Sequence, residues 1–336
     1  MIAGLIDHSY IFNSSSMIRL FKNIVVYGIL ILLVLEGLVR IFHLHNDLPE
    51  RYVAKDGMLK WIPGQNGYTV YGNRRQNFAE YHINNSGYNS YREFRPTDSK
   101  TEVAIIGDSY IEGFHQNYYN SIGKQVESKL NDVEVYEYGH SSNDLADQLY
   151  LIYANQEKFD KVDYVILYMK YENDLQRPEY EFIPREPLFP LLRHSKLVVY
   201  LLNIGILDPV KNLHQKVNSL KSGMLAGGGN QDETSKNKPK IDRDSLYLEN
   251  FKSLVSKYGF DKSKTAILLD SRATNSDFLA YLKQENINVI DFAVPFKEAG
   301  GHRRTTLIYD HHWNHTGRKV IATEISTYLQ KVLPKQ

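Results

Sequence analysis

The sequence predicts an α/β protein whose parallel sheet is covered by helices on both faces and is preceded by one apolar N-terminal helix. Two observations predict this class. From Thr101 onwards, short apolar runs alternate with amphipathic helical patterns, and this alternation is typical of parallel sheets. Near the N-terminus, residues 24–35 read IVVYGILILLVL and carry no charge, which sets this stretch apart from the rest of the chain.

The composition excludes several classes of protein. The chain has 336 residues, 42% of them hydrophobic, and these are the proportions of a globular protein. Lys and Arg number 40 against 39 Asp and Glu, so the net charge of +1 gives no electrostatic footprint for nucleic acid. The absence of cysteine removes disulfides, thiolate metal sites and a cysteine nucleophile.

The N-terminal apolar segment has three interpretations. Residues 18–42 are long enough to span a membrane if Arg19, Lys22 and Arg40 extend towards the interfaces. A cleaved signal peptide would need a small-x-small site after the apolar run, and the sequence there is bulky and polar. A buried core helix would usually show a polar stripe. We favour a single membrane anchor, whose orientation the flanking charges leave open because basic residues lie on both sides.

The chain divides into a series of expected segments. They are an N-terminal tail (1–17), the transmembrane anchor (18–42), an irregular β-rich lead-in (43–100) rich in Gly, Asn and Tyr, and a main domain (101–336) with an insertion at 175–244. Met17 is a second plausible start, because MIRLFKNIVV begins like a signal anchor.

The main domain shows five apolar runs that we expect to be strands. Helical patterns lie between them, the first with Asn120 as its N-cap. The expected strands are 102–107, 133–139, 162–170, 265–270 and 287–292, and the helices include 121–130, 142–159, 278–285 and 316–333.

The insertion has two halves of different composition. Residues 187–207 are apolar, but Arg193, His194 and Lys196 interrupt them, so a lid or packing helix is favoured over a second span. Residues 222–244 are rich in glycine and then in charge, which is the composition of a flexible loop.

Polar side chains follow the expected strands at the ends where open α/β sheets place their sites. The groups are Gly107-Asp108-Ser109, Gly139-His140-Ser141-Ser142-Asn143, Glu172-Asn173-Asp174 and, before the last helix, Asp310-His311-His312-Trp313-Asn314. A serine nucleophile needs a base and an acceptor that orients the base. Ser109, a histidine of the 310–315 loop and Asp310 supply these three parts. The Ser109 amide, an amide after the second strand and the Asn173 side chain are candidate oxyanion donors.

Each group also has a simpler interpretation. Gly-Asp-Ser alone is a common helix N-cap, and Asn173-Asp174 alone is a common turn. His311, His312 and His315 with Asp310 could form a metal site, which we disfavour because the sequence shows no comparable second cluster. The combination, in this order and at these strand ends, is more specific than any one part.

Three motifs together resemble the SGNH, or GDSL-type, serine hydrolases. They are GDSYIEG at 107–113, Asn-Asp after the third strand, and DHHWN-TG at 310–317. The resemblance runs from Glu102 to the C-terminus without the insertion. It implies a flavodoxin-like, three-layer α/β/α fold with about five parallel strands. It also implies a serine esterase or acyltransferase acting on ester bonds without a cofactor or a metal.

The resemblance assigns roles to particular residues. Ser109 would be the nucleophile and an oxyanion donor through its amide, and Asn173 would donate its side-chain amide. His312, followed by Trp and Asn, would be the base oriented by Asp310, with His311 as the second choice. The chain departs from the family at Tyr171 and at Ser142, each of which stands where a glycine is usual. Ser142 can still donate its amide, and Gly139 is the other candidate.

An anchor followed by such a domain is similar in plan to the proteins of alginate acetylation and teichoic-acid D-alanylation. This plan implies an extracytoplasmic enzyme on a bacterial cell membrane that hydrolyses O-acetyl esters on an envelope carbohydrate. The alternatives are an O-acyltransferase working with a membrane-bound O-acyltransferase partner, a lipid esterase, and a non-catalytic envelope assembly protein. Residues 188–207 would supply an apolar lid for the lipid esterase.

Overall fold

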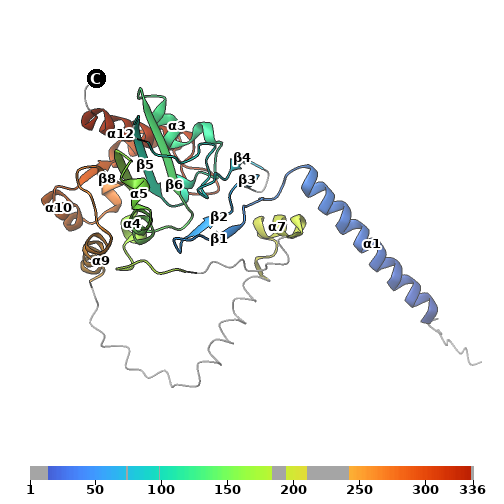
Figure 1. The fold of residues 1–336 in the computed structure, drawn as a ribbon. Coiled ribbons are helices and arrows are strands. Elements are labelled where there is room, and N and C mark those ends of the chain that lie inside the picture. Colours follow the sequence, from blue (N-terminus) through green and yellow to red (C-terminus); the bar gives the residue numbers. More distant parts are fainter. Residues whose placement is uncertain (1–13, 73–74, 98, 184–193, 210–241, 334–336) are drawn as a thin grey trace, which may run out of the picture. The chain divides into compact units, whose positions relative to one another are not determined.

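The computed structural model describes residues 14–72, 75–97, 99–183, 194–209 and 242–333 (Figure 1). The chain forms two compact units, one from residues 1–45 and 187–215 and the other from residues 46–186 and 216–336. Most of the stretch expected to be flexible, 222–244, lies outside the described residues.

The first unit contains two described helices, α1 (Ser14–Ile41) and α7 (Lys196–Asn203). Within α1, Met17–Ile41 has a mean hydropathy of 2.4 and is long enough to cross a membrane. Its side chains are almost entirely exposed, so α1 is not the buried core helix of a soluble domain. A membrane anchor and a signal sequence both fit this helix.

The second unit is built on a five-stranded parallel sheet, which confirms the expected fold class. The strands lie in the order β6-β5-β7-β8-β9, and every neighbouring pair is parallel. Their bounds are β5 Thr101–Gly107, β6 Val133–Gly139, β7 Tyr164–Tyr168, β8 Thr265–Leu269 and β9 Asn288–Asp291. The chain passes from β5 to β6 on one side and returns to β7 on the other. The strand order therefore reverses at the end of β5, where such sheets hold their ligands.

Helices cover both faces of the sheet, because successive strand residues point to opposite sides. Ile106 belongs to a core with α4 (Leu145–Ala154), α9 (Arg243–Tyr258) and α10 (Ser276–Gln284). Ile105 belongs to a second core with α3 (Ile122–Glu127), α11 (Ala293–His302) and α12 (His315–Val332). Among the described residues of this unit there are also three single-turn helices: α2 (Ser109–Glu112), α5 (Gln156–Phe159) and α6 (Tyr171–Asp174). Short 3-10 turns form at Tyr118–Asn120 and Ser271–Ala273.

The predicted N-cap of α3 is wrong by one residue. Ser121, not Asn120, caps the helix, and its Oγ accepts a hydrogen bond from the Lys124 amide at 3.2 Å. Asn120 ends the preceding 3-10 turn instead, where its carbonyl accepts a hydrogen bond from Gln125 Nε2 at 2.8 Å.

The lead-in contains two antiparallel hairpins. The first pairs β1 (Arg51–Val53) with β2 (Leu59–Trp61), and the second pairs β3 (Asn66–Tyr71) with β4 (Asn77–His82). Met58 and Phe94 belong to the same buried cluster as the sheet residues. The lead-in is therefore packed into the unit that contains the parallel sheet.

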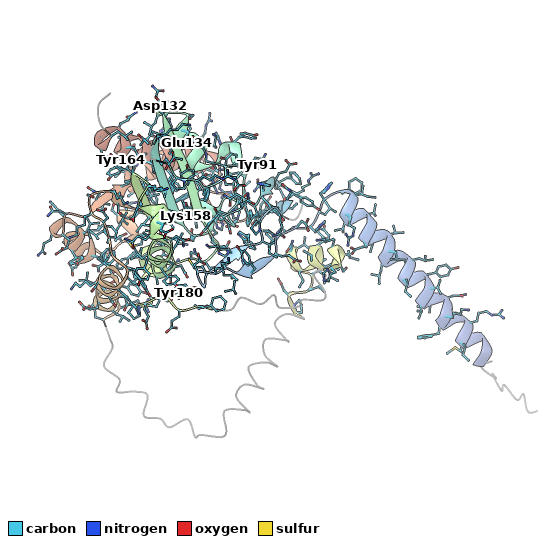
Figure 2. The ribbon with its side chains drawn as sticks, viewed as in Figure 1. Tyr91, Asp132, Glu134, Lys158, Tyr164 and Tyr180 are labelled. Atoms are coloured by element: carbon cyan, nitrogen blue, oxygen red, sulfur yellow. The ribbon has the colours of Figure 1, made fainter. Side chains whose placement is uncertain are left out.

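Several of the 25 tyrosines hold separate parts of this unit together. Figure 2 labels Tyr164 and Tyr180, which are two examples, and also Tyr91. Tyr180 stacks on Tyr150 with 4.0 Å between ring centroids and donates a hydrogen bond to the Gly57 carbonyl at 2.9 Å. The Tyr164 hydroxyl donates to the carbonyl of Val332 at 2.9 Å. Because these hydroxyls bind backbone carbonyls, the two tyrosines join separate segments of the unit.

Candidate active site

Strand β5 ends in a tight turn that presents Ser109. Asp108 caps α2, and its Oδ1 accepts a hydrogen bond from the Tyr110 amide at 2.9 Å. The N-cap interpretation of Gly-Asp-Ser is therefore realised, but by Asp108, which leaves the Ser109 side chain for another contact. As the first residue of the helix, Ser109 has an N–H without a helical acceptor. Gly113 ends the helix in the left-handed conformation, with a φ of 77°.

Helix α2 lies so close to strand β6 that only glycine fits opposite it. A Cβ at Gly139 would lie 2.0 Å from the Glu112 nitrogen and 2.4 Å from the carbonyl carbon of Ile111. The sequence nominates Gly139 as an oxyanion donor. The structure gives the same residue a packing role, because it lets the nucleophile helix sit directly on the sheet.

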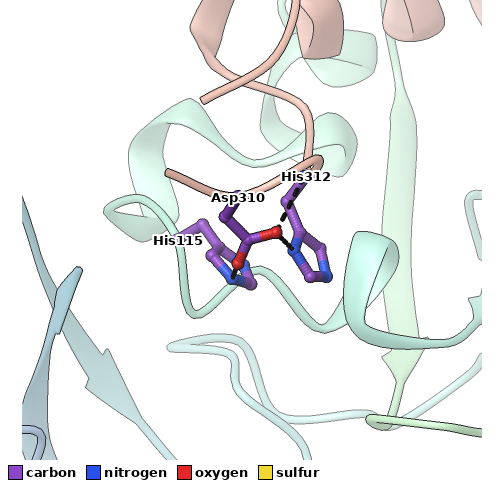
Figure 3. Close-up of side chains that lie close together, drawn as sticks. All are labelled: His115, Asp310 and His312. Carbon is purple, nitrogen blue, oxygen red and sulfur yellow. Dashed lines mark hydrogen bonds and ion pairs between the residues drawn. The ribbon is translucent and has the colours of Figure 1, made fainter. Parts of the chain in front are cut away.

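The loop before α12 brings His312 and Asp310 to Ser109. His312 Nε2 lies 2.7 Å from Ser109 Oγ. On the other side of the ring, His312 Nδ1 is hydrogen-bonded to Asp310 Oδ1, which also accepts from the His312 amide at 3.1 Å (Figure 3). Buried Trp313 and the N-cap Asn314 fix the end of this loop. The hydroxyl, imidazole and carboxylate thus lie in the order that acyl transfer requires.

The other histidines of this loop point elsewhere. His311 is exposed, and its carbonyl accepts a hydrogen bond from the Tyr110 hydroxyl at 3.2 Å. His315 is exposed at the start of α12. Of the two candidate bases, the structure therefore places His312 against the serine and leaves His311 in solvent.

His115 is a member of this cluster that the sequence analysis does not identify. Its Nε2 lies 3.1 Å from Asp310 Oδ2, so the two carboxylate oxygens bind one imidazole each (Figure 3). The His115 ring stacks on His312 with centroids 3.8 Å apart and planes 19° apart. Tyr71 stacks on His115 at 4.3 Å. The one available signal is that His115 follows the GDSYIEG motif closely, and this does not reveal a partner 195 residues away.

Burial sets the protonation of the two histidines. It lowers the pKa of His115 to about 4, so this ring is neutral at pH 7 and its Nε2 proton points at Asp310. Burial also lowers the pKa of His312, although Asp310 opposes the shift. The hydrogen bond from His115, with those from His312, lowers the pKa of Asp310 and keeps it ionised. With Nδ1–H donated to Asp310, His312 Nε2 is the free acceptor for the serine proton.

The same three side chains could in principle bind a metal. Their candidate ligand atoms lie within 4.8 Å of one another. An imidazole binds a metal through a lone pair in the plane of its ring. The stacked rings of His115 and His312 set these lone pairs side by side instead of converging on one point. The four-residue set suggested by the sequence does not form, because His311 and His315 point to solvent.

The candidate oxyanion donors differ in their backbone conformation and exposure. Ser142 has a φ of 64°, the left-handed region that favours glycine, which fits its place where the resemblance implies glycine. Asn173 lies on the exposed side of α6, and no hydrogen bond within the described residues joins its side chain to Ser109. Tyr171 is buried, and its hydroxyl donates to Asp244 Oδ1 at 2.8 Å, which accommodates a large side chain where glycine is usual.

A polar groove begins beside the nucleophile turn. Lys170 forms an ion pair with Asp108, the residue before Ser109, and its Nζ lies 5.0 Å from the centre of the Tyr110 ring. The groove has a volume of about 530 Å³ and follows the carboxyl ends of β7, β8 and β9. Its lining combines polar side chains with apolar and aromatic ones and does not include Ser109, Asp310 or His312. The polar residues are Lys170, Glu172, Asn173, Asp244, Asp270, Arg272, Thr274 and Asn275, and the others are Tyr168, Met169, Tyr171, Ala273 and Phe292.

The lead-in holds the loop that carries His115. Trp61 Nε1 donates a hydrogen bond to Glu112 Oε1 at 2.8 Å, and Ser141 Oγ donates to the other oxygen of the same buried carboxylate. Burial raises the pKa of Glu112. Asn77 Nδ2 donates to the His115 carbonyl at 2.7 Å. Side chains from before the parallel sheet thus fix the segment that follows the nucleophile.

Comparison with known proteins gives distant structural similarities. No protein-family model matches the chain, and no curated protein is similar to it in sequence. A member of the lipolytic protein G-D-S-L family from Veillonella parvula has 16% identity over 69% of this chain and 99% of its own, with a TM-score of 0.39. A lipase/acylhydrolase from Enterococcus faecalis has 12% identity over 70% and 99%, with a TM-score of 0.40. The esterase EstA from a Pseudoalteromonas species has 12% identity over 69% and 97%, with a TM-score of 0.38.

Proposed function

We propose that the chain is a serine esterase that hydrolyses O-acyl esters of carbohydrates. The observation that carries the proposal is the 2.7 Å contact between Ser109 Oγ and His312 Nε2, with Asp310 on the opposite ring nitrogen. The geometry matches a nucleophile, a base and an orienting carboxylate.

The reaction follows from the protonation of these groups. His312 Nε2 takes the hydroxyl proton as Ser109 Oγ bonds to the acyl carbon, and Asp310 stabilises the imidazolium. The intermediate collapses by breaking the bond to the sugar oxygen, which receives the proton from His312. Water then repeats both steps on the acyl-enzyme, releasing the acid and restoring Ser109.

The developing oxyanion needs donors near Ser109. The Ser109 amide at the start of α2 is one, because a first-turn N–H has no helical acceptor. The Ser142 amide is the second, in a turn whose left-handed backbone suits a glycine-like donor position. Asn173 is the third and would have to turn its side chain from the exposed face of α6 when substrate binds.

The groove supports a carbohydrate substrate over a lipid. Carboxylates such as Asp244 and Asp270, with Asn275 and Arg272, can bind the hydroxyls of a sugar. An acyl chain would need a continuous apolar wall, and the groove is lined mainly by charged and amide side chains. A small acyl group such as acetyl would leave room in this groove for the sugar.

The apolar helix supports a location at a membrane. We propose that α1 is a single-pass anchor in a bacterial cell membrane and that the second unit is extracytoplasmic. O-Acetyl esters of envelope carbohydrates are found there, and the anchor would hold the esterase near them.

An O-acyltransferase is the second candidate. The same acyl-enzyme would form, but a sugar hydroxyl seated in the groove would replace water as the acceptor. The polar groove beside Lys170 favours this alternative as much as it favours hydrolysis. A membrane-bound O-acyltransferase would then supply the acyl group.

One experiment tests the nucleophile. The full-length protein in detergent is treated with a fluorophosphonate probe, and labelled peptides are sequenced. We expect label on Ser109 and none in Ser109→Ala, which should also lose hydrolysis of p-nitrophenyl acetate. Acetylated xylan is then offered with and without a free oligosaccharide. Release of acetate supports the esterase, and transfer to the oligosaccharide supports the acyltransferase. The non-catalytic alternative would be supported if the probe labelled neither the parent protein nor Ser109→Ala and if cells carrying Ser109→Ala kept a normal envelope.

A further inference from the structure

A carboxylate of the apolar helix α1 caps the short helix α7 from the insertion. Glu36 accepts hydrogen bonds from Ser195 Oγ at 2.9 Å, from the Lys196 amide at 2.9 Å and from the Leu197 amide at 2.8 Å. The first-turn amides of a helix lack helical acceptors, and the N-terminus of a helix attracts negative charge. Two segments 159 residues apart are thus joined by three bonds to one side chain.

Arg40 strengthens this junction, which we call the Glu36 clamp (Glu36, Arg40 and residues 194–197). Its guanidinium lies one turn after Glu36 and binds Glu36 Oε1 at 2.7 Å. The same guanidinium donates to the His194 carbonyl at 3.0 Å. The charge of Glu36 is therefore balanced, and both sides of the junction are held.

The composition of α7 suits contact with lipid. The helix reads KLVVYLLN, and an apolar stretch continues after it to Ile206, which is 61% exposed. Eight residues make a helix about 12 Å long, far short of the roughly 30 Å hydrocarbon core of a bilayer. Helix α7 therefore cannot span, but it can lie along an interface.

We propose that residues 194–209 form a second membrane-contacting element, held at the bilayer interface by the Glu36 clamp. The proposal commits to lipid as the occupant of the apolar surface that begins on the half-buried side chains of α7 and ends at the exposed Ile206. The clamp lies in the last two turns of α1. A spanning α1 would leave the membrane there, so the clamp would hold α7 at the level of the bilayer interface. This inference depends on α1 being an anchor and is independent of the esterase chemistry.

The clamp also favours retention of α1. Removal of a leader peptide would take Glu36 away and leave the Lys196 and Leu197 amides without this acceptor, so that only the Ser195 hydroxyl, which accepts from the Val198 amide, would cap α7. A helix that is part of the folded insertion is better explained as a permanent anchor than as a cleaved signal.

The absence of cysteine allows a direct test. The full-length protein carrying Ile206→Cys is labelled with a fluorophore and placed in vesicles of phosphatidylethanolamine and phosphatidylglycerol whose acyl chains carry bromine. We expect quenching at this position. Leu32→Cys in the middle of α1 is the quenched control, and the exposed Ser256→Cys in α9 is the unquenched one.

A second variant tests the clamp itself. When Glu36→Ala is combined with Ile206→Cys, the introduced thiol should react with a membrane-impermeant maleimide about tenfold faster, the factor that corresponds to loss of a helix cap worth about 1.4 kcal/mol. Leu32→Ala, also in α1, should leave the rate unchanged. An unquenched label at position 206 with Leu32→Cys still quenched would overturn the proposal. Protection of the introduced thiol that appears only at high protein density would also overturn it, by indicating a second copy as the occupant.

Discussion

The hydrogen bond from His115 to Asp310 should contribute directly to the rate. We consider two substitutions that separate the bond from the ring. His115→Phe keeps an aromatic ring between Tyr71 and His312 but removes the N–H that lies 3.1 Å from Asp310 Oδ2. His115→Gln keeps an amide donor of similar reach and removes the ring.

The expected magnitude follows from the charge on Asp310. A hydrogen bond to a charged group is worth about 1.5–3 kcal/mol, and each 1.36 kcal/mol of barrier is tenfold in rate. If loss of the bond frees Asp310 to move away from His312, kcat/KM of His115→Phe should fall by about 10- to 100-fold. His115→Gln should retain most of the rate.

The pH profile gives a readout that a merely structural role would not move. His312 acts as a base only when neutral, and burial lowers its pKa, so the acid limb of kcat/KM should lie below pH 6.5 in the parent enzyme. Without the His115 donor, Asp310 is held less firmly beside His312 and stabilises the imidazolium less. The pKa of His312 then falls, and the acid limb should move to lower pH in His115→Phe.

The assay is hydrolysis of p-nitrophenyl acetate from pH 4 to pH 9, with melting curves to show that both variants fold. Equal loss of rate in His115→Phe and His115→Gln would refute the role of the bond and point to ring packing. An unshifted acid limb in a folded, slow His115→Phe would also contradict the electrostatic reasoning.

Three other changes follow from the same geometry. Gly139→Ala should lower the free energy of unfolding by about 1–3 kcal/mol or more and abolish activity, because the added Cβ would push α2 away from β6. Urea unfolding curves measure the loss of stability, and the esterase assay measures the loss of activity. Ser142→Gly should raise the free energy of unfolding by about 1 kcal/mol because it relieves a left-handed backbone, and Ser142→Val should lower it. EDTA should leave hydrolysis unchanged, because the stacked rings of His115 and His312 set their lone pairs side by side; strong inhibition that zinc reverses would contradict this.

The sheet and the groups at its ends could be predicted because both leave local signals. Each strand of the sheet is a short apolar run, because a parallel strand that is buried on both faces carries apolar side chains along its whole length. Ser109, Asp310 and His312 stand beside such runs or in a dense polar motif. The parallel topology then brings their ends to one edge, so proximity follows from the fold class alone.

The remaining parts of the site depend on contacts that have no local signal. His115 meets Asp310 only through tertiary folding, because 195 residues separate them in the sequence. Glu112 is a buried carboxylate whose donors, Trp61 and Ser141, come from separate elements. The cap at Ser121 rather than Asn120 depends on where one 3-10 turn ends. Such pairings depend on tertiary geometry, which periodicity and composition do not encode.

The lead-in belongs to the architecture of the site rather than serving as a spacer. A buried carboxylate without donors is strongly destabilised, and Trp61 is one of the two side-chain donors described for Glu112. Asn77 and Tyr71 then fix the backbone and the ring of His115. A chain that began at the first strand of the sheet would keep Ser109, Asp310 and His312 but lose these three supports. The geometry of the serine, histidine and aspartate therefore depends on residues that lie before the motif by which the sequence resembles a hydrolase.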